Sequence, residues 1–342
     1  MATALVTPEP PRLSARIEAF PYERGHRPLN GPERAQVVLV EIHDGSHRGR
    51  GEAVPDTENL ATGETVPGET VEEILATVEN LATEVAAGAL SRRALLRVLP
   101  PGPARNALDC AFWDLEAKRA ESAVYQMAGL EVPMRKTTAF PLRLDTPEAM
   151  AKMAQEESHR PILKLPLPQH LADERLTAVH TAAPNSQLII DGLGSWELRP
   201  LSIILPLLTA ANAILIERPM RRDLEHHLAT LPRDIPLCAR GCRNARDLEA
   251  AAGLYDAVSF CLDETGGLTA ALDLMDRAEE MGFQLAISSR DGTSLSVAPA
   301  MLLAARAQWI DLGQPLHLSR ERQPGLRYDG SMLYPPGVSL WG

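Results

Sequence analysis

The chain has 342 residues, 45% of them hydrophobic and 23% charged, which is typical of a soluble globular protein and excludes a disordered one. This length predicts one large domain, or a large domain with a smaller one. The formal net charge of -11 would repel a polyanion, so nucleic acid is excluded as a partner.

The start of the chain and its cysteines indicate a cytoplasmic protein without a membrane segment. MATALVTPEPPRL lacks the basic and then apolar stretches of a secretory signal, and no apolar run of membrane-spanning length follows. The four cysteines are too few, in a chain this long, for a disulfide framework or a pair of Cys-x-x-Cys zinc motifs. We therefore expect reduced thiols.

From about residue 134 onward, short apolar runs alternate with amphipathic helical stretches. The runs are TTAFPLRL, PILKL, QLIID, AILIE, IPLCA, AVSFC, FQLAIS and QWIDL. Eight strands with helices between them predict an α/β fold, a (β/α)7β barrel of the TIM type. An open doubly wound sheet is disfavoured because no Gly-x-Gly-x-x-Gly turn follows the first strand.

The first hundred residues predict a separate α+β capping domain over residues 1–105. LSARIEAF and AQVVLVEIHD look like paired strands, and VEEILATVENLATEVAAG looks like one helix, with Thr70 and Glu73 as its capping box. A bridging helix is expected within residues 106–132, and the barrel within 133–319. The tail, from about residue 320 to 342, is expected to complete the capping domain.

The carboxyl ends of the predicted strands supply the candidate site residues, because chemistry gathers there in such barrels. These residues are Lys164, Pro166, Asp191, Glu217, Arg240, Cys261, Arg290 and Asp311. Asp191 and Glu217 end apolar runs on consecutive strands, where a carboxylate is rarely buried without a partner. They are either ligands for a hard cation or a substrate ammonium, or the N-caps of the following helices.

Long motifs in order run through nearly the whole chain. They are GRGEAVP, RNALDCAFWDLEAK, LKLPL, IIDGLGSW, LIERP, IPLCARGC, SFCLDETGGLTAAL and the tail PGLRYDGSMLYPPGVSLWG. Together they resemble the enolase superfamily in its mandelate racemase and muconate-lactonizing group. Within that group the chain is most similar to the dipeptide epimerases, which act on Ala-Glu or related N-acylated amino acids.

The resemblance implies a Mg²⁺ bound by three strand-end carboxylates, and lysines on opposite faces of the substrate that move its α-proton. Asp191 and Glu217 fall on the first two metal positions. Arg240 falls on the third, in IPLCARGC, where the family has Ala-Asp-Glu-Ser. Lys164 is the first lysine of the family's Lys-x-Lys, but Pro166 and Cys261 occupy the positions of the two other lysines.

The resemblance also marks positions that would meet the substrate. Asp311 and Gly313 match an Asp-x-Asp that resembles an ammonium-binding pair, and Arg290 replaces a methionine. Arg24 resembles the Arg-Gly of the mobile loop that meets the substrate carboxylate. We therefore expect Arg24, Arg240, Arg290 and Asp311 to bind substrate.

These replacements predict that no metal is bound. A divalent ion about 4 Å from a guanidinium faces repulsion of about 8 kcal/mol at an effective dielectric of ~20. Arg240 is expected to take the place of the ion, with its guanidinium forked between Asp191 and Glu217.

Three functions are weighed. The favoured one is a divergent family member without metal-dependent racemase activity that binds a small carboxylate or amino-acid-like anion at the barrel mouth. The second is a metal-independent isomerase or lyase that uses Lys164, Cys261 and the arginines, and it requires a reactive thiol. The third is an intact Mg²⁺-dependent dipeptide epimerase. A homo-oligomer is left open.

Overall fold

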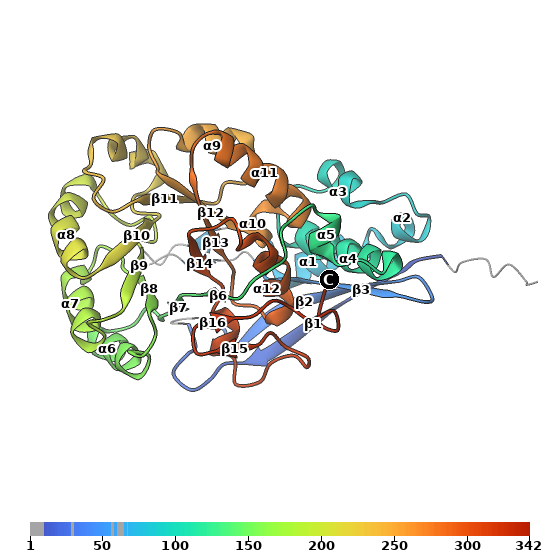
Figure 1. Cartoon of the computed structure of the whole chain (residues 1–342), viewed down its shortest axis with the longest axis horizontal. Coiled ribbons are helices and arrows are strands. Elements are labelled where there is room, and N and C mark those ends of the chain that lie inside the picture. The colour runs from blue at the N-terminus through green and yellow to red at the C-terminus, as the bar shows by residue number, and fades with distance from the viewer. Residues whose placement is uncertain (1–9, 29–30, 56–57, 60–64, 67) are drawn as a thin grey trace, which may run out of the picture.

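A computed structural model describes residues 10–28, 31–55, 58–59, 65–66 and 68–342. Its larger part is a barrel of parallel strands surrounded by helices (Figure 1). The smaller part is a three-stranded antiparallel sheet with helices against it, which lies to the right of the barrel in Figure 1.

The barrel contains all eight strands that the sequence predicts, paired in chain order. They are β7 (Phe140–Pro141), β8 (Ile162–Pro166), β9 (Gln187–Asp191), β10 (Ala213–Glu217), β11 (Leu237–Arg240), β12 (Ala257–Cys261), β13 (Gln284–Ser288) and β14 (Trp309–Asp311). Hydrogen bonds between the first and last strands close the ring: Ala139 N donates to Ile310 O at 2.8 Å, and Leu312 N donates to Thr138 Oγ1 at 2.8 Å. The predicted barrel fold is confirmed.

Helices cover the outside of the barrel and follow the strands along the chain. They are α6 (Pro147–Glu156), α7 (Ala172–Ala182), α8 (Leu198–Ala210), the 3-10 helix η1 (Arg222–Thr230), α9 (Ala245–Ala251), α10 (Leu262–Thr265), α11 (Leu268–Glu280), α12 (Ser294–Leu303) and the 3-10 helix η2 (Gln314–His317). Inside the ring, small and medium apolar side chains from alternate strand positions form the barrel centre. Among them are Ala139, Ile189, Leu215, Cys238, Ala257 and Ala286.

The cap is built from three antiparallel strands and helices that pack on them. The strands are β1 (Arg12–Pro21), β2 (Arg34–His43) and β3 (Arg48–Ala53), and a two-residue pair, β4 (Glu58–Asn59) and β5 (Thr65–Val66), follows them. The helices are α1 (Val71–Glu79), α2 (Ala82–Ala86), α3 (Arg92–Val98), α4 (Pro103–Ala120) and α5 (Val124–Met127). The capping box of Thr70 and Glu73 is confirmed.

The single helix predicted over residues 71–88 is wrong, because the chain breaks into α1 and α2 at Asn80 and Leu81. Asn80 N still makes the regular helical bond to Ala76 O, but Leu81 N donates to Val78 O, three residues back, at 3.1 Å, and this tighter turn ends α1.

β3 and α4 approach each other at backbone distance because β3 contains two glycines that face the helix. A Cβ at Gly49 would lie 2.1 Å from Ala111 O, and one at Gly51 would lie 2.0 Å from Ala107 O. Since real Cβ atoms do not come this close to other heavy atoms, neither position accepts a larger residue without a shift of the helix.

The chain after η2 returns to both parts. β15 (Tyr328–Asp329) and β16 (Met332–Leu333) form a small sheet with β6 (Lys136–Thr137). The indole Nε1 of Trp341 donates to Cys110 O on α4 at 3.0 Å, and Arg322 pairs with Glu52 on β3 at 2.7 Å. The tail therefore contacts the cap, although the domain limits at residues 105, 132 and 319 stay predictions.

In the described ranges, no helix is both long and apolar enough to cross a bilayer. All four cysteines are free and buried, as expected for reduced thiols. The cytoplasmic location stays a prediction.

A buried carboxyl connects the barrel with the cap. Asp263, on α10, accepts hydrogen bonds at the same oxygen, Oδ1, from Val54 N at 3.1 Å and from Asn106 Nδ2 at 2.9 Å. Burial raises the pKa of Asp263 to about 7, against the smaller opposing effects of these bonds and of Arg290. The carboxyl therefore loses its proton near neutral pH while it remains between the two parts.

We expect Asp263 to make the fold less stable as pH rises. A carboxyl whose pKa is higher in the folded than in the unfolded chain stabilises fully below the unfolded value of about 4, and this stabilisation is lost as pH rises through about 7. Asp263→Asn keeps an acceptor oxygen for Val54 and Asn106 but has no charge. Between pH 4.5 and 7.5, the free energy of unfolding, measured by urea titration, should fall in the wild type by on the order of a few kcal/mol more than in Asp263→Asn. The exposed control Asp273→Asn should follow the pH dependence of the wild type. If Asp263→Asn follows it as well, the assignment is contradicted.

Candidate functional site

A cavity of about 620 Å³ lies between the carboxyl ends of the barrel strands and the cap. From the cap it is lined by residues that include Tyr22, Val54 and Glu72. From the barrel, its lining includes Lys164, Pro166, Asp191, Arg240, Arg290 and Asp311. Most of the strand-end residues predicted from the sequence therefore face one space.

Strand alternation explains why these side chains meet. Ile189 and Leu215 point to the barrel centre, so Asp191 and Glu217, two residues further along the same strands, point inward one layer higher. Glu217 and Asp191 are also direct neighbours in the parallel register of β10 and β9. The barrel thus changes from an apolar interior to a charged layer at its carboxyl end.

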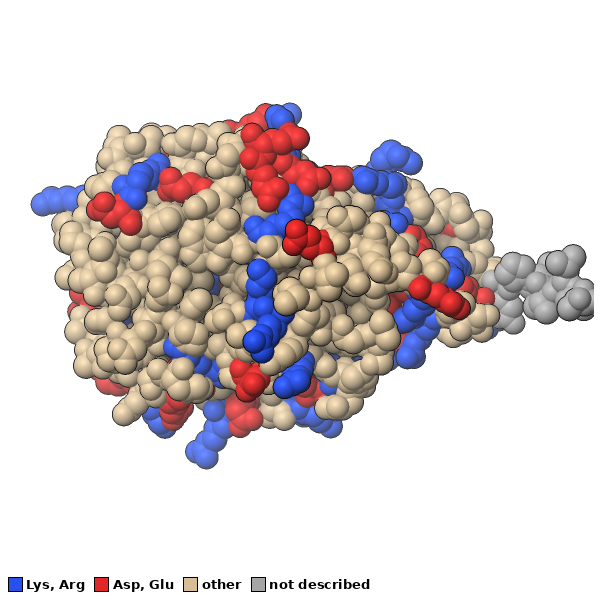
Figure 2. Space-filling view, viewed as in Figure 1, with Lys and Arg blue, Asp and Glu red and all other residues tan. Residues whose placement is uncertain are grey.

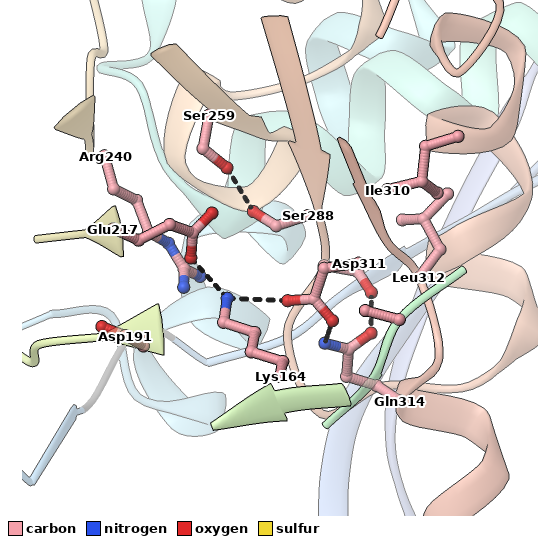
Figure 3. A network of polar contacts seen from close by, with 12 residues as sticks. Lys164, Asp191, Glu217, Arg240, Ser259, Ser288, Ile310, Asp311, Leu312 and Gln314 are labelled. Carbon is pink, nitrogen blue, oxygen red and sulfur yellow. Dashed lines mark hydrogen bonds and ion pairs between the residues drawn. The ribbon is translucent and has the colours of Figure 1, made fainter. Parts of the chain in front are cut away.

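Lys164 lies at the centre of this charged layer. Its Nζ is 2.5 Å from Glu217 Oε2 and 2.8 Å from Asp311 Oδ2 (Figure 3). Gln314 Nε2 donates to the other oxygen of Asp311 at 3.0 Å. Burial lowers the pKa of Lys164, but the charges of Asp311 and Glu217 outweigh it and raise the pKa above the ordinary lysine value. Lys164 is therefore a fixed ammonium that joins β8, β10 and β14.

Asp191 is held by a residue that the sequence argument did not consider. Arg218 donates to it through Nε at 3.1 Å and through the terminal nitrogen Nη2 at 2.7 Å, and Leu193 N donates at 3.0 Å. Burial opposes ionisation, but Arg218 and Lys164 together hold the pKa of Asp191 below its usual range. Arg218 takes a left-handed backbone conformation (φ 43°) directly after β10, which no residue pattern indicated.

The forked position of Arg240 between Asp191 and Glu217 stays a prediction. Asp191 accepts hydrogen bonds from Arg218, Glu217 accepts one from Lys164, and Arg240 Nε donates to Glu264 Oε1 at 3.1 Å. Glu264 is a buried carboxylate on α10 that the sequence did not indicate. The second predicted arginine, Arg290, donates to the same Glu264 oxygen at 3.1 Å.

Besides Glu217, which does not line the cavity, two more of the predicted residues lie away from its lining. Cys261 is buried, and burial together with Glu264 and Asp263 raises the pKa of its thiol to about 12. Arg24 is exposed, and its backbone N–H donates to the side chain of Glu23 at 3.2 Å. Neither belongs to the residues that line the cavity, so their roles stay predictions.

Arg143 is a lining residue that sequence reasoning missed. Nη1 donates to both oxygens of Asp291, at 3.0 and 2.7 Å, and Nε donates to His26 O at 2.8 Å. Arg143 thus joins the end of β7 to the cap segment that contains His26 and to the loop after β13. The sequence did contain a signal for Arg143. Side chains alternate along a strand, and Arg143 lies an even number of residues, four, after the inward-facing Ala139, so it points to the same side.

Two family models match the chain. The "Enolase C-terminal domain-like" model matches residues 147–332, and the "Mandelate racemase / muconate lactonizing enzyme, N-terminal domain" model matches residues 26–129.

Characterised relatives are similar over most of their length. The N-acetyl-D-glutamate racemase of a Pseudoalteromonas species is 37% identical over 72% of this chain and 79% of its own. The L-Ala-D/L-Glu epimerase of Escherichia coli is 32% identical over 92% of this chain and 95% of its own. An enolase family member from Agrobacterium tumefaciens, with homology to dipeptide epimerases, has a solved structure that covers 97% of this chain and 100% of its own, at 36% identity and a TM-score of 0.88.

The prediction of a metal-free protein is corrected by these relatives. The Agrobacterium tumefaciens structure holds sodium together with L-Ala-L-Glu, and a dipeptide epimerase from Methylococcus capsulatus, 24% identical with a TM-score of 0.80, holds Mg²⁺ with L-Arg-D-Lys. The charge of Arg240 does not act alone against a cation, because Glu264 binds Arg240 and offsets its charge.

The residues present fit a cation through two carboxylates. Asp191 and Glu217 are neighbours in register, and hard cations such as Mg²⁺ accept one or two protein carboxylates when water and ligand oxygens supply the rest. Within the described ranges, no cluster of three or more His, Cys, Asp or Glu side chains could hold a metal. Asp191 and Glu217 are therefore the residues that would hold an ion, and they would share their oxygens with Arg218 and Lys164, which already donate to them.

Proposed function

This chain belongs to the enolase superfamily, in the mandelate racemase and muconate lactonizing enzyme group, and from that premise we propose that its barrel mouth binds a small amino-acid-derived carboxylate. We further propose that the chain does not invert such a ligand by the two-base proton transfer that the family resemblance implied. The observation that carries the proposal is the ammonium of Lys164 held between Glu217 and Asp311.

The cavity supports the binding of a carboxylate. Its wall contains the guanidinium groups of Arg143, Arg240 and Arg290, whose forked N–H donors match the geometry of a carboxylate. The similarity to an N-acetyl-D-glutamate racemase, to an L-Ala-D/L-Glu epimerase and to a structure with bound L-Ala-L-Glu supports a ligand of this class. A cation held by Asp191 and Glu217 would add positive charge for the same carboxylate.

Inversion at an α-carbon needs an unprotonated base on one face and a proton donor on the other. Lys164 is kept protonated by its two carboxylates, and Pro166 has no titratable group. Cys261 would need a thiolate, but its pKa is raised to about 12. This argues against both the two-base route and the metal-independent alternative built on a reactive Cys261.

Binding is tested by thermal melting with N-acetyl-L-glutamate and glutarate. A ligand that binds only the folded chain raises the melting temperature with concentration, by the equivalent of about 2.7 kcal/mol at a hundred times its Kd. Arg290→Gln should reduce the rise because it removes a guanidinium from the cavity wall. Arg97→Gln, an exposed position on α3, should leave the rise intact. The binding proposal fails if neither anion shifts the melting temperature, or if Arg290→Gln behaves like Arg97→Gln.

Proton transfer is tested by NMR in D₂O. The chain is incubated with L-Ala-L-Glu or N-acetyl-L-glutamate, with sodium and Mg²⁺ present, and the α-proton signal is followed. We expect no loss of signal beyond the protein-free sample, whereas the Escherichia coli epimerase serves as a positive control with L-Ala-L-Glu. Deuterium incorporation that disappears in Lys164→Met would show that Lys164 acts as a base and that the chain is an active epimerase.

A further inference from the structure

Three carboxylates in the cavity wall, two of them buried and Asp291 partly exposed, already have a cationic partner inside the protein. Asp191 is bound by Arg218, Asp291 by Arg143, and Asp311 by Lys164. Both oxygens of Asp311 are in use, one by Lys164 Nζ at 2.8 Å and the other by Gln314 Nε2 at 3.0 Å. Both oxygens of Asp191 likewise accept from Arg218.

These bonds decide how the cavity would treat a ligand ammonium. An ammonium buried without a carboxylate partner loses its hydration and gains little in return. To reach Asp311 it would have to displace the ammonium of Lys164, which is tethered and only 6% exposed. The remaining acidic side chain of the lining, Glu72 on α1, is exposed, so a pair with it would stay solvated and weak.

A ligand carboxylate, unlike a ligand ammonium, would meet side chains of opposite charge in the cavity wall. Arg143, Arg240 and Arg290 all line the cavity, and the terminal Nη2 of Arg143 has no hydrogen-bond partner within the part of the chain that the structure describes. A buried guanidinium nitrogen without an acceptor is costly, and a ligand oxygen that reached it would remove that cost.

We propose that the ligand of this cavity carries a carboxylate and an acylated, uncharged nitrogen, and that ligands with a free ammonium are selected against by the internal pairing of Asp191, Asp291 and Asp311. This inference rests on the proposed function, because it specifies the chemical class of the same ligand. A dipeptide with a free amino terminus and its N-acetyl derivative differ only in the feature concerned.

The test compares L-Ala-L-Glu with N-acetyl-L-Ala-L-Glu by isothermal titration calorimetry with the full chain. At pH 7 the acetylated ligand should bind with a Kd at least about tenfold lower, since the free amine is then charged and its burial is opposed. At pH 9, above the amine pKa of about 8, the two affinities should converge. The acetylated ligand reports any titration of the protein itself.

Glu72→Gln distinguishes the exposed carboxylate of Glu72 from the carboxylates that are paired inside the protein. The ratio of the two Kd values should be the same in Glu72→Gln as in the wild type. If the free amine binds as tightly as the acetylated ligand at pH 7, or if Glu72→Gln weakens the free amine alone, the inference is wrong while the proposed function stands. If neither ligand binds, the proposed function itself fails.

Discussion

The ammonium of Lys164 between Glu217 and Asp311 is the interaction on which the rest of the site depends. It joins the ends of three strands that are distant around the ring, β8, β10 and β14, with three side chains that are nearly inaccessible to solvent. Removing one partner of such a buried set leaves an uncompensated charge, at a cost of about 3–5 kcal/mol. The same bonds keep Lys164 protonated, so one arrangement serves the stability of the barrel mouth and removes a candidate base.

The arrangement of paired charges extends outward from Lys164. Arg218 binds Asp191, Arg143 binds Asp291, and Glu264 binds Arg240 and Arg290, so the charged side chains that the barrel contributes to the cavity wall are held in ion pairs. Residues of the cap line the other side of the cavity, and Arg143 joins the cap through the carbonyl of His26. The face of the molecule seen in Figure 2 is different, because acidic and basic side chains lie there side by side among broad uncharged areas. The negative net charge of the chain therefore says little about the ligand, which meets guanidinium groups in the cavity.

Much of the fold was predictable because it follows from patterns of residues that are close together in the sequence. The eight apolar runs, the buried helix α4 and the capping box before α1 each depend on residues close in sequence. The rule that chemistry gathers at the carboxyl ends of the strands correctly brought Lys164, Asp191 and Asp311 to one end of the barrel. The break between α1 and α2 was missed because the apolar spacing continues through it.

The partners of the charged residues were missed for another reason. Arg218 owes its direction to a left-handed backbone, and Glu264 belongs to a one-turn helix, so neither position follows from periodicity. Counting Arg240 without Glu264 also led to the wrong expectation about the metal.

The protonation state of Lys164 is the most direct test of this account. The chain contains only four lysines, so lysine labelled with ¹³C at Cε gives few NMR signals, and Lys164→Arg identifies the one from Lys164. The other three lysines serve as internal references. The account predicts that the Lys164 signal keeps the chemical shift of an ammonium from pH 6 to about 10.4, where an ordinary lysine is half deprotonated. A Lys164 signal that titrates near neutral pH would contradict it, because Lys164 would then be available to accept a proton from a bound ligand.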